Sequence, residues 1–543
     1  MQSHSSGWKS DAVSGFLVFL IALPLCLGIA MASGFPPVAG ILTAVIGGVV
    51  ATWMGSARLT IKGPAAGLIV IALGAVQELG GGDMRLGYRR ALAAITVAAV
   101  IQIVFALVRA GTFGDFFPSS VVHGMLAAIG IIIFSKQAHV LLGVSPAGTQ
   151  PLKLLGEIPH SLSLLNPEIA LIGVLSLVIL FGHPYLKGRL AWLKRVPAPL
   201  LVLLVAVPLG LAFDLGHAHT YTFSLTHEAY KLGPDFLVNL PSNFLSAITF
   251  PDFSAVFSAA SLKYIAMFAL VGSIESLLSV KAIDSLDPEQ HRSNLDKDLL
   301  ATGVGNLAAG LLGGLPMISE IVRSSANIGY GAKSRLSNFF HGLFLLVFVA
   351  FAPALIHRIP LAALAAMLIY TGVRLASPRE FVKTFRIGPE QLLIFGVTLM
   401  TTLATDLLVG VAAGIVVKLG MHLLNGATPR GLFRPFIVER EEDGRVELRV
   451  EGAAVFSNFL GLKKRLARFS HVREVIIDLS RARLVDHTVM EKLHQLESEF
   501  GREQRHLELR GLNEHRRFSR HPLAARKKPG LRIGPSQDAS SAS

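Results

Sequence analysis

Two series of long apolar segments, joined by polar loops, constrain the fold of this chain more than any other feature. The first series lies near residues 12–31, 38–54, 65–76, 91–108, 118–134, 168–186 and 198–213. The second lies near residues 262–282, 297–312, 318–330, 339–355, 360–373, 390–405 and 408–424. A helix needs about 20 apolar residues to cross a bilayer, and only 16% of the residues are charged. The pattern predicts an α-helical polytopic membrane protein with fourteen transmembrane segments.

The third segment of each series is short and is introduced by glycine and proline. Gly63-Pro64 precedes the first of these short segments, and Gly314-Leu315-Pro316 precedes the second. Interrupted segments at matching positions are the best sequence indication of an inverted repeat with a substrate site between its halves. Because each series has seven segments, the second half runs opposite to the first, and we expect a 7+7 inverted repeat.

Charged side chains within these segments indicate where the site lies. Glu275 interrupts the apolar stretch Tyr264–Val280, and the second short segment contains Glu320 and Arg323 after Ser319. A charge at the bilayer centre costs about 2.5–3.5 kcal/mol on insertion scales, so such residues usually face a polar cavity. The sequence therefore predicts a binding site near the middle of the membrane.

The first short segment has the composition of an anion site. A helix N-terminus offers unpaired N–H groups and roughly half a positive charge. Gly63, Ala65, Ala66 and Gly67 are small enough to let an oxyanion approach the backbone. Pro64 suits the first helical position, where no N–H is needed. The alternative is that these small residues only allow close helix packing in the membrane.

The residues after the last apolar segment predict a small soluble α/β domain. Strand patterns at Arg445–Val450, Glu474–Ser480 and His506–Arg510 alternate with helical patterns at Ser457–Phe469 and Asp486–Phe500. Such alternation predicts a partly parallel sheet. Because the apolar pattern ends before this region, we expect the domain to be soluble, and the orientation derived below from the basic residues puts it in the cytoplasm.

These patterns give a set of expected domain limits. Residues 1–10 form an N-terminal cytoplasmic segment, 11–425 the transmembrane domain, 433–520 the α/β domain and 521–543 a disordered basic tail. Within the transmembrane domain, repeat one covers 11–213, an extracytoplasmic loop covers 214–259, and repeat two covers 260–425.

The distribution of basic residues gives the expected orientation. Lys and Arg accumulate in cytoplasmic loops, and they are more frequent in the loops that share the side of the N-terminus, although Arg85–Arg90 argues the other way. We therefore expect both termini in the cytoplasm and the chain in the cell inner (plasma) membrane. The basic residues between Arg516 and Arg532 favour contact with anionic lipid headgroups over nucleic acid, because they follow a membrane domain.

Several other function classes find no support in the sequence. The chain has no His-Glu-x-x-His, no Gly-x-Ser-x-Gly and no Walker-type Gly-Lys-Ser/Thr motif, so neither a standard hydrolase nor an ATP-driven pump is expected. We expect no enzyme activity and no cofactor, and we assign no metal site. The one cysteine, Cys26, excludes an intrachain disulfide. A passive anion channel and an anion sensor without flux stay open as alternatives.

A set of short motifs runs through both halves and into the α/β domain. They are Ser14-Gly15 with Ala22–Pro24, Gly34–Pro37, Gly63–Gly67, Gly272–Leu278, Gly314–Pro316, Arg323–Ser325, and Asp478–Ser480 with Asp486. In this order and spacing the chain resembles the sulfate permease (SulP) family of anion transporters with its C-terminal STAS domain, over about residues 10–515. The resemblance implies core and gate domains, a homodimer, and short third and tenth segments whose N-termini point at the anion. A cytoplasmic partner of the STAS domain stays open.

The resemblance also implies which residues hold the anion. The implied set is Gly63, Pro64, Ala65, Ala66, Gly67, Ser319, Glu320, Ile321, Val322 and Arg323. Arg323 would neutralise the bound anion, and its other expected role is an ion pair with Glu320, three residues earlier. The substrate stays open among sulfate, bicarbonate and C4-dicarboxylates.

The coupling ion follows from a departure from the family pattern. In the sodium-coupled bicarbonate branch, positions matching Glu275, Ser279, Ser319 and Ile321 contribute to a cation site. Here Ile321 has no side-chain oxygen, and Glu320 adds a carboxylate. We therefore expect Glu275, Ser279, Ser319 and Glu320 to serve H+ or Na+, with H+ favoured because burial favours the neutral form of a carboxyl group. The expected function is symport of an oxyanion with this cation by alternating access.

One position in the STAS domain has two interpretations. Thr488 matches the residue that is phosphorylated in the related anti-sigma-factor antagonists, which would make it a regulatory site. Asp486, directly before the second helix, has the residue type that caps helix N-termini. We expect the cap.

Overall fold

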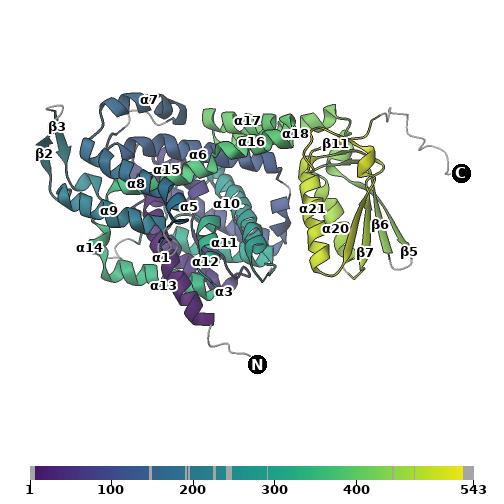
Figure 1. The fold of residues 1–543 in the computed structure, drawn as a ribbon, viewed down its shortest axis with the longest axis horizontal. Helices are drawn as coiled ribbons and strands as arrows, with labels where there is room; N and C mark the ends of the chain where they lie inside the picture. Colours follow the sequence, from purple (N-terminus) through teal and green to yellow (C-terminus); the bar gives the residue numbers. More distant parts are fainter. Residues whose placement is uncertain are drawn as a thin grey trace. The chain divides into compact units, whose positions relative to one another are not determined.

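The computed structural model describes residues 7–115, 117–145, 150–189, 193, 196–223, 228–239, 248–289, 291–442, 445–469 and 471–529 (Figure 1). The chain forms two compact units. The first contains the residues up to Gly114 together with Leu126–Ala376, and the second contains Asp115–Met125 together with the residues from Ser377 onward.

The helices coincide with the fourteen predicted segments, which confirms the expected fold class. The first repeat contains α1 (Gly7–Ala32), α2 (Pro37–Ile46) continued by η1 (Gly47–Ala51) and α3 (Thr52–Met54), α4 (Ile69–Gly80), α5 (Met84–Leu107), α6 (Ser119–Leu141), α8 (Pro167–Leu186) and α9 (Ala198–Ala212). The second contains α10 (Ala259–Leu286), α11 (Leu295–Leu312), α12 (Ile321–Gly329), α13 (Leu336–Phe351), α15 (Leu361–Leu375), α17 (Pro389–Ala404) and α18 (Leu407–Leu424). Among the described residues, eight helical stretches are long and apolar enough to cross a membrane, and four shorter apolar helices accompany them.

Further elements lie between these segments. The sequence did not predict α7 (Pro151–Ser163) or α16 (Pro378–Ile387), because their polar faces break the apolar pattern. A short helix, α14 (Pro353–Ile356), follows α13. The polar stretch between the repeats carries a hairpin of β2 (His219–Thr222) and β3 (Ala229–Leu232).

Local sequence signals fix where the helices begin and end. Asp83 caps α5 by accepting hydrogen bonds from the backbone N–H groups of Arg85 and Leu86, which satisfies two donors at the helix start. Asn294 caps α11 in the same way. At its other end, α11 stops at Gly313, whose φ of 101° is left-handed and favours glycine. This stop frees the chain to become extended before the second short segment.

The core of the first unit forms where α1 packs between α2, α13 and α15. Leu27 of α1, Ile41 of α2 and Leu345 of α13 are all fully buried. Because α1 is apolar around its circumference, it can be enclosed on several sides by other helices. This packing holds α1 against the two short segments described below.

The second unit contains a mixed sheet after α18 and the short α19 (Pro429–Phe433). Its strands are β5 (Phe436–Glu442), β6 (Arg445–Ala454), β7 (Glu474–Asp478), β8 (Ala482–Val485), β9 (His506–Arg510), β10 (Arg516–Arg517) and β11 (Arg526–Lys527). β6 pairs in parallel with β7 and β8, and β7 with β9, while β5 is antiparallel to β6. The predicted, partly parallel sheet is confirmed.

Two helices, α20 (Phe459–Arg468) and α21 (His487–Arg502), lie on one side of this sheet (Figure 1). Alternate residues of β6, including Val446 and Leu448, pack with Leu462 of α20 and Leu493 of α21 in one buried cluster. The period of two in a strand places such residues on one face. The domain therefore has its own hydrophobic core.

Both ends of the chain differ from the expected limits. Helix α1 begins at Gly7, inside the segment 1–10 that was expected to precede the membrane domain, and residues 1–6 lie outside the described residues. The prediction of a disordered tail from residue 521 is wrong for 521–529, because β11 pairs with β8 and β10. Residues 530–543 lie outside the described residues.

Candidate functional site

The two short segments meet through a pair of antiparallel strands in the first unit. β1 (Ile61–Pro64) leads into a single 3-10 turn, η2 (Ala66–Leu68), and then into α4, while β4 (Met317–Glu320) leads directly into α12. Lys62 pairs with Ser319, and Gly63 with Ile318. The pairing brings the N-termini of the two half-helices, one from each repeat, to the same place. The expected juxtaposition of the third and tenth segments is therefore present.

Neither half-helix is capped by the side chain that precedes it. Ala65, before η2, has no polar side chain, and Glu320, before α12, makes no capping hydrogen bond. The first N–H groups of a helix have no partner within the helix and must be satisfied from outside. Both N-termini can therefore accept an anionic group.

Arg323 lies in the first turn of α12, and its guanidinium group lies beside Gly63 of β1. Its side chain is buried, with 1% of the residue exposed, and a Cβ on Gly63 would collide with its Nη1. Nη1 also lies 3.5 Å from Cys26 Sγ of α1, and Nε and Nη2 have no hydrogen-bond partner among the described residues. A buried guanidinium with unused donors strongly favours an anion nearby. Gly63 is small because the guanidinium occupies the space beside it.

Glu275 of α10 lies against the other short segment. A Cβ on Gly67 would overlap both oxygens of its carboxylate, so any larger residue there would force the Glu275 side chain to move. The Oε2 atom of Glu275 is buried and has no hydrogen-bond partner among the described residues. The carboxylate therefore stands beside the backbone of the first half-helix, where an anion would otherwise approach.

Glu320 faces the same N-terminus from the opposite repeat. Its Oε1 accepts a hydrogen bond from the Ala66 N–H at 3.3 Å. The expected ion pair between Glu320 and Arg323 is not formed within the described part of the chain, because residue 320 is extended and the helix begins only at Ile321. Glu320 and Glu275 interact electrostatically with each other. Two carboxylates therefore lie at the start of the first half-helix.

The remaining predicted residues fall into different environments. Pro64 and Ala65 are buried in the crossing, whereas the side chains of Ile321 and Val322 are exposed, at 44% and 40%. Ser279 is buried on α10, one turn after Glu275. The structure thus brings Gly63, Ala66, Gly67, Glu275, Glu320 and Arg323 together. Ser279 is not joined to Glu275 by a hydrogen bond, and of Ile321 and Val322 only the backbone begins α12 at the crossing.

Sequence reasoning missed a buried ion pair directly behind the crossing. Lys62 Nζ lies 2.7 Å from Asp298 Oδ2 of α11 and donates to Ser319 Oγ at 2.9 Å. Ser319 was expected at the coupling-ion site, but its hydroxyl group is hydrogen-bonded to Lys62 and Asp298. The position of Lys62 directly before Gly63-Pro64 was a usable signal, because that segment was already expected at membrane depth.

A second residue that the sequence analysis did not identify is His341 of α13. It is fully buried, and both ring nitrogens lack a hydrogen-bond partner in the described residues. His341 interacts electrostatically with Arg323. A histidine inside an apolar helix is a usable signal, because ionisable residues in membrane segments mark functional sites.

The STAS-domain prediction concerns the second unit. Asp486 caps α21, because its Oδ1 accepts from the Val489 N–H at 2.7 Å, and its Oδ2 accepts from the Phe456 N–H at 3.0 Å. The expected cap is confirmed. Burial alone raises the pKa of the Asp486 carboxyl, but Lys418, His422 and these two N–H donors outweigh burial, so the pKa lies below its ordinary value.

Thr488 is completely buried and bound to the last apolar helix. Lys418 of α18, itself fully buried, donates from Nζ to Thr488 Oγ1 at 2.7 Å and lies 3.4 Å from Asp486 Oδ2. His422 Nε2 lies 3.4 Å from the same oxygen. A phosphoryl donor cannot reach Thr488 in this conformation, so a regulatory role there requires α21 to separate from α18.

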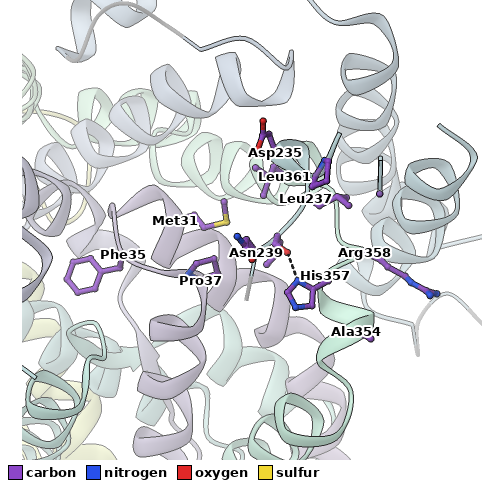
Figure 2. Close-up of a pocket in the computed structure, with 13 residues that line it drawn as sticks. Met31, Phe35, Pro37, Asp235, Leu237, Asn239, Ala354, His357, Arg358 and Leu361 are labelled. Carbon is purple, nitrogen blue, oxygen red and sulfur yellow. Dashed lines mark hydrogen bonds between the residues drawn. The ribbon is translucent and has the colours of Figure 1, made fainter. Parts of the chain in front are cut away.

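A separate concavity of about 790 Å³ lies elsewhere in the first unit (Figure 2). Its polar lining includes Asp235, Asn239, His357 and Arg358, and His357 Nδ1 lies 3.2 Å from the Val238 carbonyl oxygen. None of the residues predicted for the anion or the coupling ion lines it. Its size alone does not make it the substrate site. Among the described residues, no group of three or more His, Cys, Asp and Glu side chains could hold a metal ion.

Comparison with known proteins agrees with this geometry. Residues 8–398 match the sequence model of the sulfate permease family. The chain is 28% identical over 474 residues to YvdB of Bacillus subtilis, a candidate sulfate transporter. This alignment covers 86% of this chain and 84% of YvdB. It is also 28% identical over 417 residues to the bicarbonate transporter BicA of Picosynechococcus, covering 76% of this chain and 70% of BicA.

A solved structure supports the fold over most of the chain. The structure of SLC26A9 superimposes with a TM-score of 0.67 and covers 92% of this chain and 84% of its own. The sequence identity is 14%. This likeness confirms the fold of a helical membrane domain followed by a small α/β domain.

Proposed function

This chain belongs to the sulfate permease family, and on that premise we propose that it is a secondary active transporter of an inorganic oxyanion. The proposed substrate is sulfate or bicarbonate, carried by symport with a proton through alternating access. The family description and the name of the relative BicA support this substrate class. A C4-dicarboxylate is the alternative cargo.

One observation carries the proposal: two carboxylates and one guanidinium surround the crossing of the half-helices. Glu320 accepts from the Ala66 N–H, Glu275 lies against Gly67, and Arg323 lies behind Gly63. With all three groups charged, this set carries one net negative charge. An anion that binds here adds to it, and like charges in a medium of low dielectric repel strongly. Simultaneous uptake of a cation removes that repulsion, which favours symport over a simple anion channel.

A proton fits the site better than a sodium ion. Sodium needs several oxygen ligands, but Ile321 has no side-chain oxygen and Ser319 Oγ is engaged with Lys62 and Asp298. A proton needs only one carboxylate oxygen, and Glu275 Oε2 has no other partner among the described residues. Neutralising the carboxylates also releases the N–H groups of the half-helix to the substrate.

The experiment is uptake into proteoliposomes of purified protein. Radiolabelled sulfate, bicarbonate and succinate are offered under an inward proton gradient, an inward sodium gradient, or no ion gradient. We expect one oxyanion to accumulate above its equilibrium level only with the proton gradient. Accumulation only with sodium would overturn the choice of ion, and flux that never exceeds equilibrium would indicate a channel or exchanger. Binding without flux would indicate a sensor.

Orientation and assembly belong to the same proposal. We propose that both termini lie in the cytoplasm, that the protein lies in the inner membrane and that it forms a homodimer. Cys26 is the one cysteine in the chain and is buried, so a Cys26→Ala background allows introduced cysteines to report sidedness. A cysteine at exposed Lys231 should react from outside intact cells, and one at exposed Glu289 should not. The reverse pattern would invert the topology.

A further inference from the structure

The ammonium group of Lys62 lies in a cage of side-chain oxygens. Nζ is 2.7 Å from Asp298 Oδ2, 2.9 Å from Ser319 Oγ and 3.4 Å from Thr302 Oγ1. Ser319 Oγ in turn lies 3.2 Å from Asp298 Oδ2. These are the oxygen types, a carboxylate and hydroxyls, that bind small hard cations in proteins.

The cage is closed to solvent and connects both repeats. Lys62, Asp298, Thr302 and Ser319 are all buried, with 2% or less of each residue exposed. Lys62 belongs to β1 of the first repeat, whereas its oxygen partners belong to α11 and β4 of the second. The hydroxyl of Ser276 on α10 extends the network, 3.3 Å from Thr302 Oγ1 and 3.2 Å from the Ser319 nitrogen.

We propose that the Lys62 ammonium is a built-in counter-cation of the membrane core, filling a cation site that the second repeat provides. Lys62 thereby supplies, from within the chain, the positive charge that balances the buried Asp298 carboxylate. No free cation has to enter at this place. The inference does not depend on which anion is carried or on whether transport is coupled.

The physical argument rests on the cost of an unpaired buried charge. Removing one member of a buried ion pair is strongly destabilising, because the other member stays charged in a medium of low dielectric. The four-carbon stem of Lys62 also fills the path between β1 and α11. Replacing Lys62 by alanine should therefore leave both a charge and a space, and a small dissolved cation should occupy them.

The test compares two substitutions that differ in the space they leave. Lys62→Ala removes charge and volume, whereas Lys62→Met removes the charge but keeps most of the volume. The thermal unfolding midpoint of detergent-purified full-length protein is measured at pH 8 in sodium, potassium, methylammonium or N-methyl-D-glucamine chloride at equal ionic strength. A cation that binds only the folded state raises this midpoint with its concentration.

We expect at least one small cation to raise the midpoint of Lys62→Ala in a saturable manner. The wild type, Lys62→Met and the double variant Lys62→Ala/Asp298→Asn should show no such difference between small and large cations. If no small cation stabilises Lys62→Ala more than its double variant, or if the wild type responds equally, the counter-cation is disproved. Failure of the wild type to accumulate any oxyanion, together with the expected stability pattern, would count against the proposed function and not against this inference.

A double-mutant cycle decides the case where Lys62→Ala does not fold. Lys62→Met and Asp298→Asn are then compared singly and together by folded yield and unfolding midpoint. The account predicts that the double variant is more stable than either single variant, because it leaves no unpaired charge. Additive losses from the two substitutions would overturn it.

Discussion

Glu320 Oε1 lies 3.3 Å from the backbone nitrogen of Ala66 and accepts its hydrogen bond. The carboxylate of one repeat thus occupies a donor at the N-terminus of the half-helix of the other repeat. This donor is one that an oxyanion would use, because N-terminal N–H groups and the helix dipole together bind negative charge. We therefore propose that Glu320 competes with the substrate for this donor.

The first prediction is that Glu320→Gln tightens anion binding at neutral pH by about tenfold, which corresponds to ~1.4 kcal/mol. The neutral amide is a weaker acceptor for the Ala66 N–H and no longer repels the substrate. Equilibrium binding of radiolabelled sulfate and bicarbonate at pH 6 and pH 8 measures this effect. Glu289→Gln is the matched control, because Glu289 is an exposed partner of Arg58. Weaker binding to Glu320→Gln would mean that Glu320 supports the anion.

The second prediction concerns Arg323. Arg323→Ala should weaken sulfate binding by about 2 kcal/mol, because a hydrogen bond to a charged group contributes about 1.5–3 kcal/mol. A monovalent anion such as bicarbonate should lose less, since its attraction to the guanidinium is smaller. Competition binding on purified protein gives both values, and Arg58→Ala serves as the control for loss of an exposed arginine. Equal losses for the two anions would argue against charge neutralisation by Arg323.

The third prediction is that Glu275→Gln separates binding from coupling. The variant should still exchange anions across the membrane but fail to concentrate them under a proton gradient, because the amide cannot take up the proton. Uptake and counterflow in the same proteoliposomes distinguish the two activities. Glu78→Gln is a suitable control, because Glu78 lies in the same half-helix region but pairs with Lys263. Undiminished concentrative uptake by Glu275→Gln would place the coupling proton elsewhere.

Much of the architecture could be predicted because membrane depth imposes strong rules. Apolar length located the segments, and the signals at Gly63-Pro64 and Pro316 located the two interrupted ones. The prediction of an ion pair between Glu320 and Arg323 was wrong. It assumed that the three-residue spacing lies within a helix, whereas residue 320 is extended, with ψ 119°. A spacing of three residues places side chains together only inside a helix.

The two buried ion pairs, one formed by Lys62 and the other by Lys418, could not be predicted from one sequence. Their partners, Asp298 and Asp486, lie far along the chain, in a helix and at a helix start. Sequence periodicity describes local structure and contains no information on which distant charges meet. The lysines themselves were visible as ionisable residues at or beside apolar segments.

The fourth prediction concerns removal of the STAS domain. Truncation after about Leu424 takes away Asp486 and Thr488, the partners of Lys418, and uncovers the Lys418 side chain. Water can then solvate the ammonium group, so we expect a smaller loss of stability than the roughly 3–5 kcal/mol of a buried pair that loses one partner. Lys418→Leu in the truncated protein should therefore change its stability little, and anion affinity should be retained. Unfolding midpoints and sulfate binding test both statements.

The outcome of that comparison also separates two roles of the domain. If truncated Lys418→Leu protein is stable but no longer binds sulfate or bicarbonate, the STAS domain takes part in the substrate site. If it binds normally, the domain acts on stability, assembly or turnover. Lys418→Leu in the full chain is the control, because it removes the ion pair with Asp486 while the STAS domain stays in place.

The most direct test of the central claim is anion affinity in a Gly63→Ala variant. A Cβ at position 63 would collide with Arg323 Nη1, whereas a Cβ at Gly182 of α8 meets no atom within 4 Å. Both variants and the wild type are purified, checked for the same unfolding midpoint, and titrated with radiolabelled sulfate and bicarbonate. If the anion binds between the half-helix N-termini beside Arg323, Gly63→Ala should lose affinity at least about tenfold, or ~1.4 kcal/mol, while Gly182→Ala binds as the wild type. Equal affinity in a folded Gly63→Ala protein would contradict this location of the site.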